Sequence, residues 1–340
     1  MPNFEDHTGG GLARRAKALV SRGADTARGL RRLGKQEQEI AALRALLARR
    51  EAGDREAGIQ PEDVVWVFGS GRTGSSWLTF MMGALSGHTR WNEPLVGYLF
   101  GHLYYERGWT RQDAKHFILG SDYEEVWLGA VRGLVLDGGA ARFPERARGG
   151  YLVIKEPHGS IGAPILMKAL PESRMIFLIR DPRDVVASSL DAHGKGSRPS
   201  ERRRTKRPEL FEKSTKADRK PDAFIKGQAK TYLQDIEFTR QAYEAHDGRK
   251  VLVRYEDLRA DTPATMKHIY STLEIPVQED ELVRVVEKFS WENIPEDEKG
   301  PGTLRRKATP GGWREDLTPE QIEIVERETA RILDEFYAGG

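Results

Sequence analysis

The chain of 340 residues contains no cysteine, which excludes disulfide bonds, thiolate catalysis and metal sites with cysteine ligands. It has no apolar run close to the roughly 20 residues that span a bilayer. Near the N-terminus, Arg14, Arg15, Lys17 and Arg22 interrupt every apolar stretch. The formal net charge is only +2, so the composition indicates no general affinity for nucleic acid. These absences predict a soluble, cytoplasmic protein whose positive charge is local.

Residues 1–60 differ in composition from the rest of the chain. Apolar residues recur there with helical spacing between charged ones: Ile40, Leu43, Leu46 and Leu47. One interpretation of this helical extension is a short coiled coil of about two heptads, used for homo-oligomerisation or for contact with an anionic partner or membrane surface. The other is a solvated, partly disordered helix. Gly53, Gly58 and Pro61 mark the boundary with a main domain over residues 61–340.

The main domain is organised around residues 64–77, which read Val-Val-Trp-Val-Phe-Gly-Ser-Gly-Arg-Thr-Gly-Ser-Ser-Trp. The apolar start predicts a buried strand, and the glycine-rich turn leads into a helix. Backbone N–H groups converge at such a helix N-terminus, where the helix dipole favours negative charge. Side chains of the turn add hydroxyl donors and a permanent cation: Thr73, Ser75, Ser76 and Arg72. The stretch predicts a cradle for phosphate or sulfate.

This loop departs from the Walker A pattern G-x-x-x-x-G-K-[ST]. Gly69, Gly74 and Ser76 fit the pattern, but Ser75 stands where a lysine would reach the β- and γ-phosphates. A P-loop kinase would also need an acid on magnesium, and the arginine directly before Asp181 opposes that role for Asp181. A P-loop nucleotide-dependent kinase stays an alternative, as does a non-enzymatic adaptor with a degenerate nucleotide-binding fold.

Strands that alternate with helices predict an α/β fold with a doubly wound parallel sheet, whose ligands bind at the carboxyl ends of the strands. Strands are expected at 64–68, 151–154, 174–179 and 251–255, and helices at 78–85, 122–136, 161–170, 185–191, 224–245, 263–274, 279–289 and 319–337. Pro182 should open one helix and Thr318 should cap the last. A polar turn is expected at 91–95. Residues 194–221 are expected to form a flexible basic loop, either a lid over an anionic ligand or a solvated loop.

The loop sequence Arg-Thr-Gly-Ser-Ser-Trp resembles the phosphosulfate-binding loop of sulfotransferases, whose donor is 3′-phosphoadenosine 5′-phosphosulfate (PAPS). The resemblance implies that one run of residues holds the 5′ end of PAPS and of its product, 3′-phosphoadenosine 5′-phosphate (PAP): Gly71, Arg72, Thr73, Gly74, Ser75, Ser76 and Trp77.

Two later segments are similar to the family's other donor contacts. Arg180 and Ser188 have the spacing of the Arg and Ser that hold the 3′-phosphate in sulfotransferases. The family's Arg-Lys-Gly-x-x-Gly-x-Trp segment corresponds to residues 306–313, which keep Arg306 and Lys307 but carry Ala308 in place of the first Gly. The resemblance therefore implies that Arg306 and Lys307 bind the donor too.

For the chemistry, the resemblance implies that Arg72 and Lys155 are cations beside the transferred group. Lys155 is alternatively a surface lysine paired with Glu156. The general base is Glu93 or His158. Glu93 follows the loop at about the distance seen in tyrosylprotein-type and several bacterial-type members, and nearby cations would keep it ionised. His158 stands one residue after the family's cytosolic His position, which a proline occupies here.

The sequence thus predicts a PAPS-dependent sulfotransferase that transfers a sulfuryl group to an acceptor hydroxyl without a metal. The acceptor is a sugar, a glycolipid or a phenol, and we favour a carbohydrate or glycolipid. The aromatic segment 98–109 and the basic loop 198–220 are expected to frame its pocket.

Overall fold

The computed structural model describes residues 58–107, 116–146, 149–194, 220–300 and 307–338, which belong to one compact unit, Gly58–Gly340. Several predicted segments lie wholly or almost wholly outside these ranges: the helical extension as far as residue 57, nearly all of the basic loop, the end of the aromatic segment and Arg306. The expectations for those segments stay predictions. Within the described ranges, no helix combines the length and the apolarity needed to cross a membrane.

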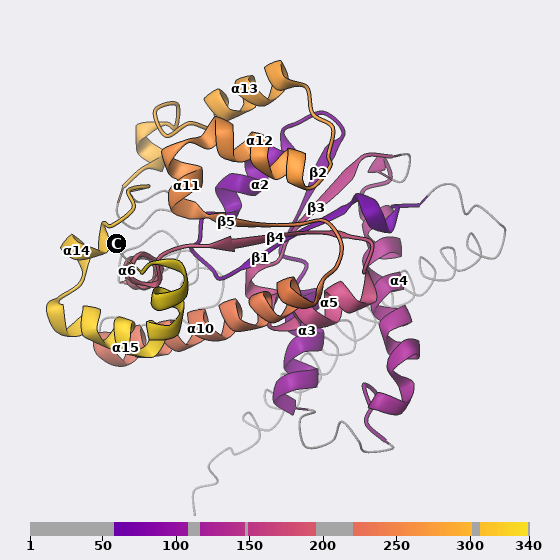
Figure 1. Cartoon of the computed structure of the whole chain (residues 1–340), viewed down its shortest axis with the longest axis horizontal. Helices are drawn as coiled ribbons and strands as arrows, with labels where there is room; N and C mark the ends of the chain where they lie inside the picture. The colour runs from indigo at the N-terminus through magenta and orange to yellow at the C-terminus, as the bar shows by residue number, and fades with distance from the viewer. Residues whose placement is uncertain (1–57, 108–115, 147–148, 195–219, 301–306, 339–340) are drawn as a thin grey trace, which may run out of the picture. The chain divides into compact units, whose positions relative to one another are not determined.

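A five-stranded sheet forms the centre of the unit, in the order β2-β3-β1-β4-β5 (Figure 1). Its strands are β1 Val64–Gly69, β2 His88–Asn92, β3 Tyr151–Lys155, β4 Arg174–Ile179 and β5 Lys250–Arg254. All four neighbouring pairs run parallel. The predicted α/β fold with a parallel sheet is confirmed.

The edge strand β2 corrects the expected turn at 91–95. Trp91 and Asn92 are strand residues, paired in register with Ile154 and Lys155 of β3. The segment His-Thr-Arg-Trp-Asn carries no apolar alternation, and most of it is only half-buried. An edge strand of this kind has no core-facing pattern that the sequence could reveal.

The central strand β1 is buried along its whole length, because helices cover both faces of the sheet. Val65 and Val67 pack on one face, and Val64, Trp66 and Phe68 pack on the other. The period of two along a strand explains this division.

The helices above the sheet in Figure 1 are α2 Ser75–Gly83, α11 Tyr255–Ala260, α12 Thr262–Thr272 and α13 Glu279–Lys288. Those below it are α3 Val96–Gly101, α4 Glu124–Arg142, α5 Ala163–Ala169 and α10 Pro221–Ala245. The core clusters agree, since each set of helices contributes apolar residues to the cluster on its own face.

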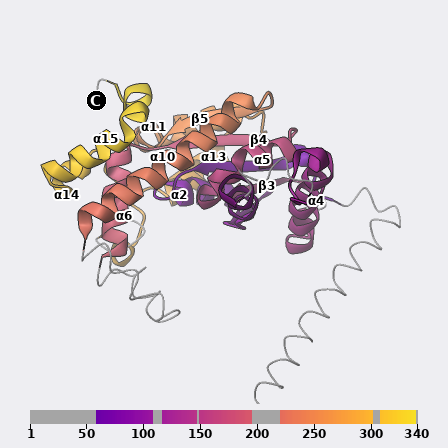
Figure 2. The ribbon, with the colours of Figure 1, turned by 90° about the horizontal axis from the view of Figure 1, so that it is seen from below.

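Three further helices pack together at one end of α10: α6 Pro182–His193, α14 Trp313–Asp316 and α15 Pro319–Phe336. Figure 2 shows α10 crossing the sheet from this group toward α5. Shorter helical turns complete the elements: η1 Pro61–Asp63, η2 His102–Arg107, η3 Ser121–Tyr123, η5 Pro157–Gly162 and η6 Glu296–Glu298.

The expected helix starts at Pro182 and Thr318 are confirmed. Pro182 is the first residue of α6, and the side chain of Asp181 accepts the Arg183 N–H at the N-cap. Thr318 forms a reciprocal capping box with Gln321 at the start of α15. The helix expected at 161–170 is shorter, because residues 157–162 form the 3₁₀ turn η5 before α5 begins.

Candidate active site

The loop between β1 and α2 is held by contacts within itself and to η5. The Thr73 hydroxyl donates to the Ser70 carbonyl (2.8 Å), and the Ser160 hydroxyl bonds both the N–H and the carbonyl of Gly69 (3.1 and 2.6 Å). Gly74 has φ +87°, and a Cβ there would lie 2.5 Å from the ring of Tyr255. Only glycine fits this position.

This conformation presents the N-terminus of α2 toward the edge where the strands end. Gly74 is the N-cap of α2, and no side chain in the part of the protein that the structure describes caps it. The first N–H groups of an α-helix have no partner within the helix. Ser75 and Ser76 begin the helix, so the start of α2 has the donors and the dipole that favour a phosphate or sulfate group.

Three of the predicted site residues meet at this edge from three elements. Nε of Arg72 donates to Oγ of Ser188 on α6 (3.0 Å), and a guanidinium N–H of Arg180, which follows β4, donates to the Arg72 carbonyl (3.1 Å). The Arg180 guanidinium also lies over the ring of Tyr255, 4.2 Å from its centroid. Arg180 and Ser188 are buried, so their positions are fixed by the fold.

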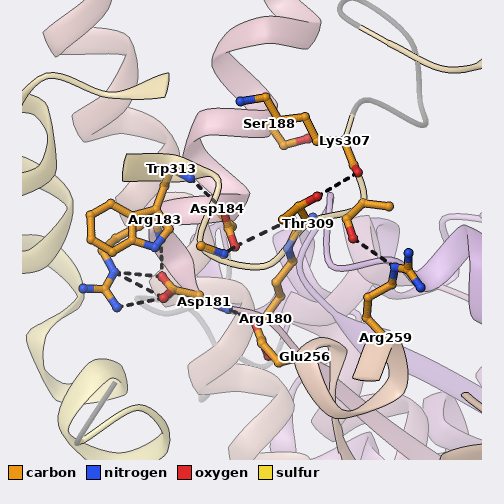
Figure 3. A network of polar contacts seen from close by, with 12 residues as sticks. Arg180, Asp181, Arg183, Asp184, Ser188, Glu256, Arg259, Lys307, Thr309 and Trp313 are labelled. Atoms are coloured by element: carbon orange, nitrogen blue, oxygen red, sulfur yellow. Dashed lines mark hydrogen bonds and ion pairs between the residues drawn. The ribbon is translucent and has the colours of Figure 1, made fainter. Parts of the chain in front are cut away.

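Asp184 on α6 ties the late segment of the chain to this cluster (Figure 3). Its two carboxylate oxygens accept the N–H groups of Gly311 (2.8 Å) and Trp313 (3.0 Å), and Oδ2 lies 3.8 Å from the Arg180 guanidinium. Burial raises the pKa of Asp184 in spite of these three favourable contacts. Asp184 was not singled out in the sequence, since an acid in the first turn of a helix is ordinary.

The late segment itself is shaped by backbone contacts. Ala308, which stands where the family has glycine, has φ +52°, in the left-handed region that glycine occupies without strain. Its carbonyl accepts Nε of Arg259 (3.0 Å), as Figure 3 shows. The ammonium of Lys307 pairs with Glu315 and Asp316 (2.8 and 2.9 Å). Lys307 therefore lies in the expected segment, but its charge is directed to these two acids.

The candidate catalytic groups lie at the end of β3 and in the turn after β2. Lys155 is buried and forms a close ion pair with Glu93 Oε1, and the Glu93 N–H donates to the Lys155 carbonyl (2.8 Å). The alternative in which Lys155 is a surface lysine paired with Glu156 is wrong. His158 Nε2 is 4.0 Å from Glu93 Oε1, and the His158 side chain is 58% exposed.

The electrostatics of this group favour an ionised Glu93. Burial alone would raise the pKa of Glu93, but the hydrogen bond and charge of Lys155, with His158 and Arg90 nearby, hold it below its usual range. Burial lowers the pKa of Lys155 in spite of the Glu93 carboxylate. His158 also joins this group to the loop, because a Cβ on Gly71 would lie 2.8 Å from its ring.

Other predicted residues lie nearby in supporting positions. Nε1 of Trp77 donates to the Phe289 carbonyl (2.8 Å), which ties α2 to the end of α13. Of the aromatic segment, Tyr98 is exposed, whereas the ring of Tyr105 packs against Phe238 at 4.6 Å between centroids. Only part of that segment therefore faces solvent.

Asp235 was not predicted as a residue that supports the site, although its position on a helix face indicated a buried contact. It lies on α10 and accepts the hydroxyl of Ser70 in the loop (2.9 Å), and burial raises its pKa to about 7. Tyr232, Ile236 and Thr239 mark the buried face of the helix, and Asp235 falls on that face. A carboxylate on a buried helix face needs a partner, so the pattern alone could have indicated a contact there.

Asp181, the residue considered for magnesium, is used within the protein. Its carboxylate accepts the Arg183 backbone N–H (2.8 Å) and pairs with the Arg183 guanidinium (2.8 Å). Arg183 also pairs with Glu326 of α15 (3.0 Å). Arg183 thus links α6 to α15, and the Asp181 carboxylate is paired with Arg183.

Comparisons with known proteins identify related chains. A family model described as a sulfotransferase domain matches residues 152–336, more than half of the chain. Sulfotransferase 2A6 and Sulfotransferase 2A1 of Rattus norvegicus are 27% and 25% identical over 188 and 181 residues. Each match covers 49% of this chain and 58% of the relative, so the chain spans less than two thirds of these relatives' length.

Among solved structures, sulfotransferase STF9 from Mycobacterium avium aligns with a TM-score of 0.50 and 14% identity, over 86% of this chain and 81% of that one. At this identity the likeness concerns the fold alone.

Proposed function

Because the chain belongs to the sulfotransferase family, we propose that it transfers the sulfuryl group of PAPS to an acceptor hydroxyl and releases PAP. The observation that carries the proposal is the meeting of Arg72, Arg180 and Ser188 at the carboxyl edge of the sheet. Arg72 follows β1 and is 108 and 116 residues away in the sequence from Arg180, at the end of β4, and Ser188, on α6. Together the three residues join two cations and a hydroxyl beside a helix N-terminus.

In this proposal the donor lies along that edge. The start of α2 and Arg72 bind the 5′-phosphosulfate, whereas Arg180 and Ser188 bind the 3′-phosphate. Lys307 and the turn at residues 311–313, which Asp184 holds against α6, lie over the 3′-phosphate end. Arg72 contacts Ser188 and so joins the two ends of the site.

Glu93 is the proposed general base. The acceptor oxygen forms a bond to sulfur, the bond between sulfur and the 5′-phosphate oxygen breaks, and the acceptor's proton passes to Glu93. The depressed pKa of Glu93 keeps it ionised at neutral pH, so it can accept the proton as charge develops on the attacking oxygen. Protonation of Glu93 weakens its ion pair with Lys155, which leaves the ammonium to stabilise the leaving oxygen. His158, more exposed and 4.0 Å from Glu93, is the alternative base.

The proposed acceptor is a hydroxyl of a carbohydrate or glycolipid. Leu95, Tyr98 and Leu99 follow Glu93 directly and are all exposed, between 43% and 57%. An exposed aromatic ring can stack on the apolar face of a sugar, and the two leucines can lie against a lipid chain. A panel of sugars, alkyl glycosides and phenols, assayed for transfer of labelled sulfuryl from PAPS, separates these acceptor classes.

The experiment that tests the donor site is calorimetric titration with PAP, without magnesium, and with ATP in the presence of magnesium. We expect the wild-type protein to bind PAP and Arg180→Ala to bind it much more weakly. Arg249→Ala is the matched control. Arg249 pairs with Glu274 on the surface (2.6 Å) and lies at the amino end of β5, whereas the proposed site lies at the carboxyl ends of the strands. Preference for ATP and magnesium, or equal PAP binding by both variants, would refute the proposed function.

A further inference from the structure

Glu156 is a buried carboxylate with no place in the chemistry above. It follows Lys155 at the end of β3 and is fully buried. Its Oε2 accepts the N–H of Leu95 (3.1 Å), and its Oε1 accepts the N–H of Gly97 (3.0 Å). Glu156 thus binds the backbone of the segment that begins with Glu93, while its neighbour Lys155 binds the Glu93 side chain.

The segment held in this way is strained and has no cap of its own. Glu93 and Leu95 have φ +49° and +62°, in the left-handed region that non-glycine residues rarely adopt. Leu95 is the N-cap of α3, and no side chain of the preceding turn caps that helix. The first N–H groups of α3 therefore find their acceptors across the fold, on Glu156. Strained backbone persists where its surroundings fix it, and the two hydrogen bonds supply that constraint.

Close packing fixes the carboxylate in turn. A Cβ on Gly159 would lie 2.2 Å from Oε1 of Glu156, and a Cβ on Gly97 would lie 2.2 Å from the Gly159 carbonyl. Glycine at these positions lets α3 lie directly on η5. Burial raises the pKa of Glu156 to about 7, while the N–H groups of Leu95 and Gly97 favour its ionised form.

We propose that Glu156 is the positioning residue of the active site, which sets Glu93 and the start of α3 relative to Lys155. The inference rests on the proposed function, because it takes Glu93 as the base. Glu156 acts through the backbone after Glu93 and does not touch the reacting atoms. Loss of its hydrogen bonds releases the turn at Glu93, and a shift of the base by about 1 Å can lower a rate by about 100-fold.

The test uses the full chain and four proteins: wild type, Glu156→Gln, Glu93→Gln and the double variant. PAP release from PAPS is measured with octyl glucoside and with water alone as acceptors, and PAP binding is measured by calorimetry. An amide oxygen replaces only one of the two acceptors of Glu156. We expect Glu156→Gln to lower kcat by about 10- to 100-fold with unchanged PAP affinity. In a protein that already carries Glu93→Gln, Glu156→Gln should lower kcat no further.

Two further variants keep this test decisive. Glu172→Gln makes the same chemical change at a surface ion pair with Arg132 (2.7 Å) and should leave kcat unchanged. Gly159→Ala leaves both carboxylates intact, but its Cβ would displace the Glu156 carboxylate. It should therefore lower kcat as well, which keeps the test valid if Glu156→Gln does not fold. Wild-type kcat in both Glu156→Gln and Gly159→Ala, or independent losses in the double variant, would overturn the positioning role.

The outcomes also separate this inference from the proposed function. Failure of the wild-type protein to bind PAP would contradict the function itself, whatever Glu156 does. Normal PAP binding with unchanged turnover in Glu93→Gln would overturn the base and its positioning residue together, and would leave the donor site standing.

Discussion

The contribution of Asp235 to the stability of this protein should fall as the pH rises from about 4 to about 7. Asp235 is 8% exposed, and its carboxylate accepts the hydroxyl of Ser70. Burial raises its pKa from 3.8 to about 7. Between these values the folded protein keeps a proton that the unfolded chain has released. The contribution of Asp235 to stability therefore declines through this window, whereas a carboxylate with a depressed pKa would make stability rise.

The size of the effect follows from the shift. One pKa unit corresponds to about 1.4 kcal/mol. A shift of about three units therefore limits the change in the free energy of unfolding that Asp235 causes to about 4 kcal/mol, and about 3 kcal/mol of this change occurs above pH 5. The Asp235→Asn variant carries an amide that cannot ionise and has a similar volume. The variant should therefore gain stability relative to wild type as the pH rises, by about 3 kcal/mol between pH 5 and 8.

Urea unfolding of both proteins at several pH values measures this difference directly. Glu156, whose pKa is also raised to about 7, contributes equally to both proteins and cancels in the comparison. Parallel curves of unfolding free energy against pH for wild type and variant would show that Asp235 does not titrate as its burial requires.

Four further predictions concern the site. Arg180→Ala should weaken PAP binding by about 30-fold or more but leave adenosine 5′-phosphate binding little changed, because only PAP carries the 3′-phosphate; equal losses in calorimetry would contradict this assignment. Gly74→Ala should abolish PAP binding, since its Cβ would lie 2.5 Å from Tyr255 at a φ of +87°, and retained affinity would show that the loop is less constrained than its contacts indicate. Glu93→Gln should lower kcat by about 100-fold or more. Because the pKa of Glu93 is held below its usual range, wild-type activity should persist as the pH falls into the ordinary range of a glutamate and be lost only below that range. Burial lowers the pKa of His158 from its ordinary 6.5, so a loss of activity below pH 6.5 but above the ordinary glutamate range would favour His158.

The fold could be predicted largely because parallel strands buried on both faces read as continuous apolar runs. β1, β3, β4 and β5 all lie where such runs were found. The edge strand β2 escaped, since it is short and mostly half-buried and its pairing with β3 depends on partners outside its own sequence. Helix starts at Pro182 and Thr318 were predictable because their capping chemistry is local.

The site was only partly predictable, because some of its contacts, like the pairing of β2, depend on residues that are distant in the sequence. Arg72, Arg180 and Ser188 were found through the resemblance of their segments to sulfotransferase motifs, and the structure brings these residues into contact. The buried carboxylates of Asp184 and Glu156 were not foreseen. Each accepts two backbone N–H groups from a distant segment, and whether a carboxylate turns inward depends on tertiary packing that neighbouring residues do not encode.

The most direct test of the central claim offers the purified protein both group donors at once. PAPS labelled in its sulfuryl group and ATP labelled in its γ-phosphate, with magnesium, are incubated with the acceptor panel, and the label in the products is counted. The account predicts sulfuryl label in an acceptor, an equal amount of PAP, and no transfer from ATP. Transfer of the phosphate label, or sulfuryl transfer that persists in Arg72→Ala and Arg180→Ala, would contradict it.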